Sequence, residues 1–240
     1  MYTPQILEAW QLDKCRRTIS SNTFYLEVCD ALMSQNKTLS VVRFADGEKL
    51  LWNMSLPLNE DDILQPNASL SKEWFDKMGV TGISKKEFQR RLLYAGRICT
   101  HAAPSLSGIV MPNYNVYYLF PYHYYYVDNF FPNAWFKDMR ENIFKAAKKV
   151  VFIHGNSEIG VSAIRNARKI GVDVTWIGME HWSQADRVIA EVRAMDDVKL
   201  VLYSSGPASK HIGPEIAYFK NIVTLDIGQA AHKFTLDWLT

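Results

Sequence analysis

The chain has 240 residues, of which 48% are apolar and 22% are charged, and this composition is typical of a globular protein with a sizeable core. Its 27 Lys and Arg residues against 25 Asp and Glu residues give a formal net charge of +2, which excludes recognition of a partner through overall charge. The three cysteines form no CxxC pair, which argues against a disulfide framework and a zinc knuckle.

The sequence gives no indication of membrane insertion. Its first residues lack the uninterrupted apolar core of a signal peptide, and no stretch approaches the ~20 apolar residues that a membrane span requires. We therefore expect a cytoplasmic protein with reduced thiols and no membrane contact.

The first half of the chain predicts two helices, one buried strand and a long irregular region. Apolar residues at helical spacing predict helices over residues 4–18 and 22–35. A β-branched run predicts a strand over residues 38–44, and a helix is expected from Gly47 onward. The regular pattern then weakens over residues 53–133.

This irregular region contains one clear helix signal and one aromatic stretch. Ser84 and Glu87 are spaced as a capping box and predict a helix that ends near Ile98. Eight residues between Tyr114 and Tyr126 are aromatic. Such rings either stack on a sugar or a base, or pack an irregular loop against a sheet, and the stretch is a candidate lid.

From residue 149 onward, strands and helices alternate with short connections. The predicted strands cover residues 150–154, 172–178, 198–206 and 221–228. The predicted helices cover residues 157–170, 183–194 and 208–219. The alternation predicts an α/β fold with a Rossmann-like, mostly parallel sheet covered by helices on both faces, which the strand at residues 38–44 joins.

Ligands bind such sheets at the carboxyl ends of the strands, and glycine next to polar residues follows all five predicted strands there. The segments are Asp46-Gly47-Glu48, His154-Gly155-Asn156, Gly178-Met179-Glu180-His181, Ser204-Ser205-Gly206-Pro207 and Asp226-Ile227-Gly228. Their recurrence predicts a ligand site along this edge of the sheet.

Asp46 and Glu48 are the candidate metal ligands. Two residues apart in an extended backbone, they point to the same side, and Gly47 permits an unusual turn between them. A shared magnesium- or manganese-type ion relieves their repulsion, because such ions take one or two carboxylates together with phosphate oxygens. The alternative is a helix start with Asp46 as the N-cap and Glu48 as a first-turn acid.

A second candidate site is the loop after the strand at residues 198–206. Small residues and a proline fill it: Ser205, Gly206, Pro207 and Ser209. Free backbone N–H groups and the helix dipole at such a junction favour phosphate, and Lys210 and His211 add positive charge. The alternative is a tight turn with proline in the first helical turn. His154-Gly155-Asn156 is a similar junction that matches neither the dinucleotide fingerprint nor the P-loop, so NAD and ATP hydrolysis are rejected.

The segment VVRFADGE, residues 41–48, resembles the RFGDGE-type signature of the GT-D class of glycosyltransferases, first recognised as a domain of unknown function. LVLYSSGPAS, residues 200–209, and VTLDIGQ, residues 223–229, resemble later segments of that family. The resemblance implies a Rossmann-like sheet and an Asp-x-Glu motif that serves a divalent metal and a nucleotide-sugar diphosphate. Ala45 stands where the family often has Gly, and residues 53–133 match no segment of the family.

The resemblance implies a transferase that moves a sugar from a nucleotide-sugar donor, expected to be UDP-linked, to a hydroxyl of a glycan or glycoprotein. A manganese or magnesium ion held by Asp46 and Glu48 would neutralise the leaving diphosphate. Arg43 and Lys210 would pair with its oxygens. A general base would activate the acceptor hydroxyl. Its candidates are Glu180, His181 and Asp226.

We interpret the chain as a single domain with four parts. Residues 1–37 form a helical N-terminal part and residues 38–52 the Asp-x-Glu strand and turn. Residues 53–148 form a variable insertion on the acceptor side, and residues 149–240 a Rossmann-like nucleotide-binding half.

Two other interpretations stay open. In the first, the same donor chemistry serves a hydroxymethylated DNA base, as in phage-type DNA glycosyltransferases, with the aromatic stretch and Arg90, Arg91 and Arg97 receiving a flipped base. The net charge of +2 gives this variant little support. In the second, the protein binds a nucleotide or phospho-ligand without turnover and needs no divalent ion.

Overall fold

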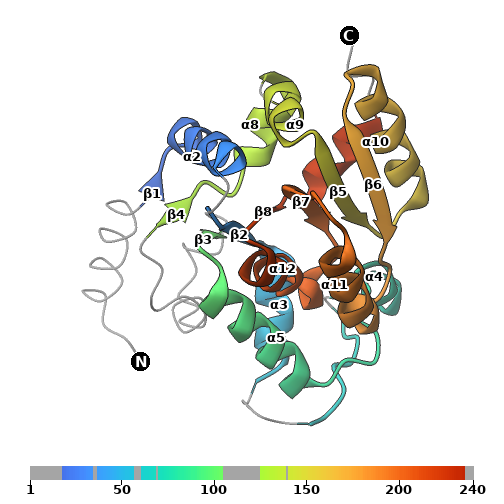
Figure 1. Cartoon of the computed structure of the whole chain (residues 1–240). Helices are drawn as coiled ribbons and strands as arrows, with labels where there is room; N and C mark the ends of the chain where they lie inside the picture. Colours follow the sequence, from blue (N-terminus) through green and yellow to red (C-terminus); the bar gives the residue numbers. More distant parts are fainter. Residues whose placement is uncertain are drawn as a thin grey trace.

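The structure, a computed structural model, describes residues 18–34, 37–56, 61–68, 70–104, 125–138 and 140–235. At its centre lies an eight-stranded sheet with the order β1-β4-β3-β2-β8-β7-β5-β6, in which neighbouring strands run parallel (Figure 1). The strands are β1 (Thr18–Ile19), β2 (Leu39–Phe44), β3 (His101–Pro104), β4 (Tyr126–Val127), β5 (Lys149–His154), β6 (Asp173–Gly178), β7 (Leu200–Ser204) and β8 (Val223–Asp226). The predicted α/β class with a mostly parallel sheet is confirmed.

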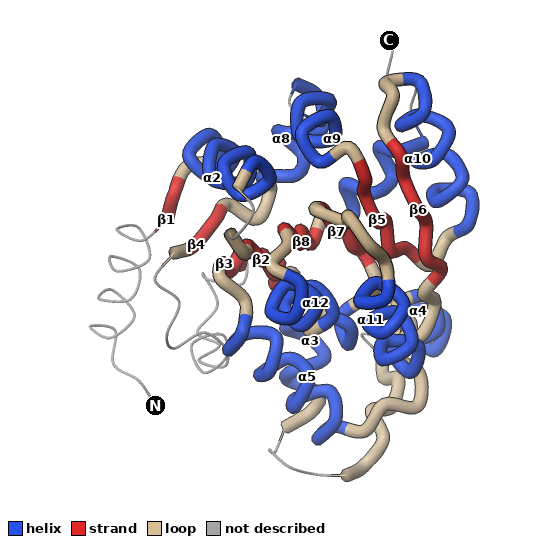
Figure 2. The backbone as a smooth tube through the Cα atoms, viewed as in Figure 1, coloured by secondary structure: helices blue, strands red, loops and turns tan. Residues whose placement is uncertain are grey.

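Helices cover both faces of the sheet, as the alternation of elements predicted (Figure 2). One face packs against α2 (Ser21–Met33), α8 (Phe131–Asp138), α9 (Arg140–Ala147), α10 (Ser157–Lys169) and the 3-10 helix η3 (Gly228–Thr235). The other face packs against α3 (Asp46–Met54), α4 (Lys72–Lys77), α5 (Lys85–Ile98), α11 (Ala185–Ala194) and α12 (Ile212–Lys220). Two short 3-10 helices, η1 (Trp182–Gln184) and η2 (Pro207–Ser209), precede α11 and α12.

Alternate residues of a central strand enter opposite cores, because successive side chains of a strand point to opposite faces. In β5, Val150 and Phe152 pack in the core on the α10 side, whereas Val151 and Ile153 pack in the core on the α11 and α12 side. All four are at most 1% exposed, and burying each such side chain stabilises the fold by about 1.5–3 kcal/mol. This double burial explains the continuous apolar run in the sequence.

The structure adds regular elements to the region that the sequence left irregular. The helix predicted at Ser84 begins there, and Ser84 Oγ accepts the N–H of Glu87 at 3.1 Å. β3 and β4 were not predicted, because His-Ala-Ala-Pro and a two-residue strand show no β-branched run; both belong to the main sheet. Of the helix predicted at residues 4–18, only Thr18 is described, and it lies in β1 because it pairs with β4, so the prediction is wrong at that residue. Residues 4–17 and the aromatic residues 114–124 lie outside the described residues.

The strand order places a topological switch between β2 and β8. From β2 the chain continues to β3 and β4 on one side, and it returns through β7 to β8 on the other. The carboxyl ends of β2, β8 and β7 are therefore neighbours at the point where open α/β sheets bind ligands. In the described part of the chain, no helix combines the length and the apolar character that a bilayer crossing demands.

Candidate functional site

Three charged side chains meet at this switch point, from α3 after β2, from the loop after β7 and from the last residue of β8. Lys210 Nζ lies 2.6 Å from Asp226 Oδ2 and 3.1 Å from Glu48 Oε1. Lys210, Asp226 and Glu48 are 8%, 0% and 5% exposed. Burial alone would lower the pKa of Lys210, but the charges of Asp226 and Glu48 outweigh it and raise that pKa above its ordinary value. These three residues, each singled out in the sequence, form one buried ion cluster.

Glu48 also holds the start of α3. Its Oε2 accepts the N–H of Ala45, the N-cap residue, at 2.7 Å, so Glu48 supplies half of a capping box. The helix-start alternative is therefore correct for Glu48, although Ala45 and not Asp46 is the N-cap. Asp46 is exposed in the first turn. Gly47 has no positive φ, and a Cβ there would meet its nearest neighbours at an ordinary 3.5 Å, so the unusual turn expected at Gly47 is wrong.

Arg43 presents its guanidinium at the same edge. Its backbone N–H donates to Asp226 Oδ2 at 3.1 Å, and its Nε donates to the carbonyl oxygen and Oδ1 of Asn129 at 2.9 and 2.6 Å. Nη1 and Nη2 have no hydrogen bond to any described residue, so this fork can pair with an anion. The guanidinium lies over Gly228, where a Cβ would come within 2.0 Å of Nη1. Asn129 follows a two-residue strand, so no sequence pattern marked it.

The loop after β7 contains buried polar atoms that have no hydrogen-bond partner among the described residues: Ser205 Oγ, Ser209 Oγ and His211 Nδ1. His211 Nε2 lies 3.1 Å from Arg91 Nη1, and because arginine only donates, Nε2 is the acceptor and Nδ1 carries the proton. Burial and the Arg91 charge lower the pKa of His211 to about 3, so the ring is neutral at pH 7. Each unsatisfied buried donor costs about 1–3 kcal/mol, and three in one loop favour an occupant with acceptor oxygens.

Residues 74–82, the end of α4 and the turn after it, cover this loop. Gly206 has φ 84°, and a Cβ there would come within 2.3 Å of the Met78 carbonyl oxygen. Gly79 approaches the next loop in the same way, since a Cβ there would lie 2.2 Å from the Glu180 carbonyl oxygen. The tight turn predicted at Gly206 is confirmed, with Pro207 at the first position of η2.

At the end of β5, the predicted ligand residues His154, Gly155 and Asn156 make contacts within the protein. Asn156 is the N-cap of α10, and its backbone N–H donates to His154 Nδ1 at 2.9 Å. Burial and the charge of His232 lower the pKa of His154 to about 4. A Cβ on Gly155 would come within 2.8 Å of the Met179 carbonyl oxygen. These contacts give all three residues structural roles, and a ligand role for them stays a prediction.

The three candidate bases differ in their surroundings. Asp226 is fully buried and paired with Lys210. His181 uses both ring nitrogens, because Nε2 donates to the Thr81 carbonyl oxygen and Nδ1 accepts from the Ser183 hydroxyl, each at 2.8 Å. The remaining candidate, Glu180, is exposed at the end of β6. Glu180 is therefore the candidate best placed to take a proton from a ligand.

The residues fit a divalent ion only in part. Among the described residues, no group of three or more His, Cys, Asp or Glu side chains has the arrangement to hold a metal. Glu48 directs one oxygen to Ala45 N–H and the other to Lys210, so it does not fit as a direct ligand. Asp46 is exposed, and one carboxylate with phosphate oxygens and water is a ligand set that Mg²⁺ accepts.

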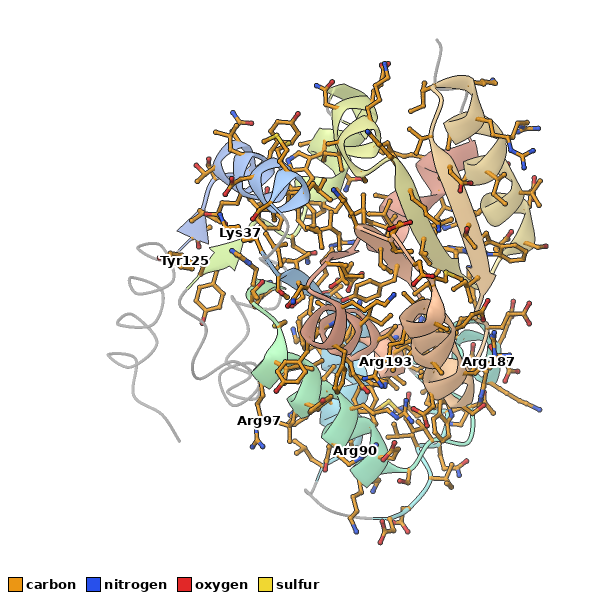
Figure 3. The ribbon with its side chains drawn as sticks, viewed as in Figure 1. Lys37, Arg90, Arg97, Tyr125, Arg187 and Arg193 are labelled. Carbon is orange, nitrogen blue, oxygen red and sulfur yellow. The ribbon has the colours of Figure 1, made fainter. Side chains whose placement is uncertain are left out.

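The basic residues considered for a DNA acceptor are largely engaged within the protein. Arg90 and Arg91 donate to Glu87 at 2.7 and 2.6 Å, and Arg91 is only 6% exposed. Arg90 and Arg97 lie along α5 (Figure 3). Because its side chain is buried, Arg91 cannot contact a flipped DNA base, so the structure excludes Arg91 from the DNA-acceptor interpretation.

The parallel sheet with helices on both faces and a switch point between β2 and β8 defines a Rossmann-like α/β fold. No protein-family model matches the sequence, and no curated protein matches it. The chain is similar in structure to a glycosyltransferase (DUF1792) from Streptococcus sanguinis, with a TM-score of 0.56, 17% identity, and coverage of 90% of this chain and 82% of that chain. It is also similar to a selenomethionine-substituted domain of unknown function 1792, with a TM-score of 0.53, 16% identity, and coverage of 94% and 83%. At these identities the likeness is one of fold, and it confirms the predicted architecture.

Proposed function

We propose that the protein is a glycosyltransferase that moves a sugar from a nucleotide-sugar donor to an acceptor hydroxyl. UDP-linked sugars are the proposed donors, and a glycan or glycoprotein is the proposed acceptor. The fold shared with a glycosyltransferase supports the reaction class. The observation that supports a diphosphate ligand is the set of unsatisfied hydrogen-bond donors in the loop after β7. These donors lie at the same edge of the sheet as Nη1 and Nη2 of Arg43. A diphosphate offers acceptor oxygens to all of them, and an apolar ligand offers none.

The residues take separate roles in this proposal. Arg43 Nη1 and Nη2 bind the donor diphosphate, with the hydroxyls of Ser205 and Ser209 as further donors. Asp46 would hold a divalent ion, Mn²⁺ or Mg²⁺, and that ion would supply positive charge to the leaving nucleotide. Glu180 accepts the proton of the acceptor hydroxyl. The local charge is consistent with a need for the ion, because Asp46, Glu48 and Asp226 bring three carboxylates to this edge, whereas Lys210 and Arg43 bring two positive charges.

Donor binding also requires movement. The hydroxyl of Ser209 is buried and the backbone of Gly206 contacts Met78, so a phosphate reaches this loop only when residues 74–82 shift. Gly79 and Gly82 have φ values of 64° and 76°, which mark the turn that would have to move. The movement would also break the hydrogen bond from Trp182 N–H to the Gly79 carbonyl oxygen.

Replacing the Arg43 fork tests the ligand class directly. Arg43→Met keeps an apolar stem but removes the charged donors, so we expect the Kd for UDP to rise about 10- to 100-fold in a calorimetric titration. Arg168→Met is the matched control, because Arg168 is exposed in the last turn of α10, at the opposite edge of the sheet. Wild-type affinity for UDP in the Arg43→Met protein would contradict the proposed diphosphate site.

A further inference from the structure

The two buried carboxylates at the switch point already have both of their oxygens in use. One oxygen of Glu48 accepts a backbone N–H at 2.7 Å, and the other lies 3.1 Å from Lys210 Nζ. In Asp226, Oδ2 accepts from Lys210 at 2.6 Å and from a backbone N–H at 3.1 Å, and Oδ1 accepts another backbone N–H at 3.2 Å. A metal ion could bind both carboxylates only by displacing the ammonium of Lys210.

Lys210 therefore stands where a shared divalent ion would otherwise lie. Two buried carboxylates that approach a common point repel each other and have lost their hydration, so they require a positive charge between them. The charges of the two carboxylates outweigh the effect of burial and raise the pKa of Lys210 above its ordinary value of 10.5. The stabilisation by this ammonium is present below pH 10.5 and is lost only as the pH rises through the raised pKa.

We propose that Lys210 is the resident cation of the Glu48 and Asp226 pair. It is a positioning residue that ties the first turn of α3 and the end of β8 to the loop after β7. A divalent ion that serves the reaction then takes its protein ligand from Asp46 and none from Glu48. The role of Lys210 stands on the geometry alone, whereas the assignment of the metal ligand rests on the proposed function.

Thermal unfolding with and without Mn²⁺ tests the role of Lys210 without any sugar donor. We expect Lys210→Met to lower the Tm by several degrees and Mn²⁺ to restore part of the loss, because the ion enters the vacated position. Adding Glu48→Gln to this variant should raise the Tm and reduce the effect of Mn²⁺, since one of the two repelling charges is gone. Lys210→Arg, which keeps the charge, should lose less than Lys210→Met.

Two results would overturn this role. One is a Lys210→Met protein as stable as the wild type. The other is a double variant, Lys210→Met with Glu48→Gln, that is less stable than the single one. If Lys210→Met does not fold, recovery of folding by the added Glu48→Gln supports the role, and failure to recover contradicts it.

Calorimetric titration of Mn²⁺ in the presence of UDP tests the metal ligand. Asp46→Asn should weaken Mn²⁺ binding by about tenfold or more, whereas Glu48→Gln should leave it unchanged. An equal loss of Mn²⁺ affinity in both variants would show that Glu48 also binds the metal and would contradict the assignment. Absence of Mn²⁺ binding to the wild type with UDP would reject the metal part of the proposed function, and the melting experiments would still decide the role of Lys210.

Discussion

Asp46 and Glu48 lie two positions apart in the sequence, yet their surroundings differ completely. Asp46 is exposed, while Glu48 is buried against Lys210, whose position is 162 residues further along the chain. Spacing predicted that both carboxylates lie at the sheet edge, and both do. It could not predict their partners, because Lys210 and Asp226 reach Glu48 only through the strand order of the folded sheet. The same reason kept Asn129, the anchor of Arg43, out of the predicted site.

The buried ring of His211 should make the free energy of unfolding depend on pH. Its pKa is about 3 in the folded protein, against about 6.5 for an ordinary histidine, so only the unfolded chain takes up a proton as the pH falls below 6.5. The free energy of unfolding should therefore fall by up to about 1.4 kcal/mol per pH unit on this account. His211→Gln retains an acceptor for Arg91 and should flatten this dependence, measured by urea denaturation between pH 6.5 and 4.5. An unchanged slope would show that His211 is not held neutral.

The same pH window contains a second histidine with a lowered pKa, the half-buried His154. His154, with a pKa of about 4, contributes a slope of the same sign. Glu87 acts at lower pH, because the hydrogen bond from Arg90 lowers its pKa to about 2 and its stabilisation is lost only below its ordinary value of 4.5. Above pH 4.5 the dependence comes from these histidines and, with the opposite sign, from Glu27, because burial raises the pKa of Glu27 above 4.5. His211→Gln should therefore remove part of the dependence and not all of it.

Among the elements, those with strong local signals were predicted well. The strands β5 and β8 and the helix α10 have continuous apolar runs or helical periodicity with caps, and the structure confirms them. The strands β3 and β4 were not predicted, because their residues form no β-branched run and are held in strand conformation by pairing with adjacent strands. The covering segment at residues 74–82 also escaped prediction, because its contacts are to distant loops.

Two glycines test whether residues 74–82 pack against the loop after β7 as described. Both Gly206 and Gly82 have positive φ, but a Cβ on Gly206 would collide with the Met78 carbonyl oxygen at 2.3 Å, and a Cβ on Gly82 would meet nothing within 4 Å. Gly82→Ala should therefore cost about 1–2 kcal/mol of stability for backbone strain alone. Gly206→Ala should cost about 1–3 kcal/mol more, because its Cβ also clashes with the Met78 carbonyl oxygen. Equal losses of stability in the two variants, measured by chemical denaturation, would show that residues 74–82 do not pack against the loop after β7.

For the whole molecule, the carboxyl edge of the sheet brings the predicted residues together in two groups. Arg43, Glu48, Lys210 and Asp226 meet where β2, β8 and β7 are neighbours. The residues after β5 and β6 lie beyond β7 and hold loops together, apart from the exposed Glu180. The fold class followed from the alternation of strands and helices. The identity of the acceptor did not, because residues 114–124, which make up most of the aromatic stretch that is the candidate lid, lie outside the described residues.

Turnover of nucleotide sugars is the measurement that tests the central claim most directly. Purified protein would be incubated with a panel of nucleotide sugars, in Mn²⁺ and in chelator, and release of the nucleoside diphosphate would be followed. We expect release from at least one donor, dependent on the ion, and a loss of about 100-fold or more in Glu180→Gln with donor affinity unchanged. A protein that binds these donors without releasing the nucleotide under any condition, with or without Mn²⁺, would contradict the transferase and favour a binding module.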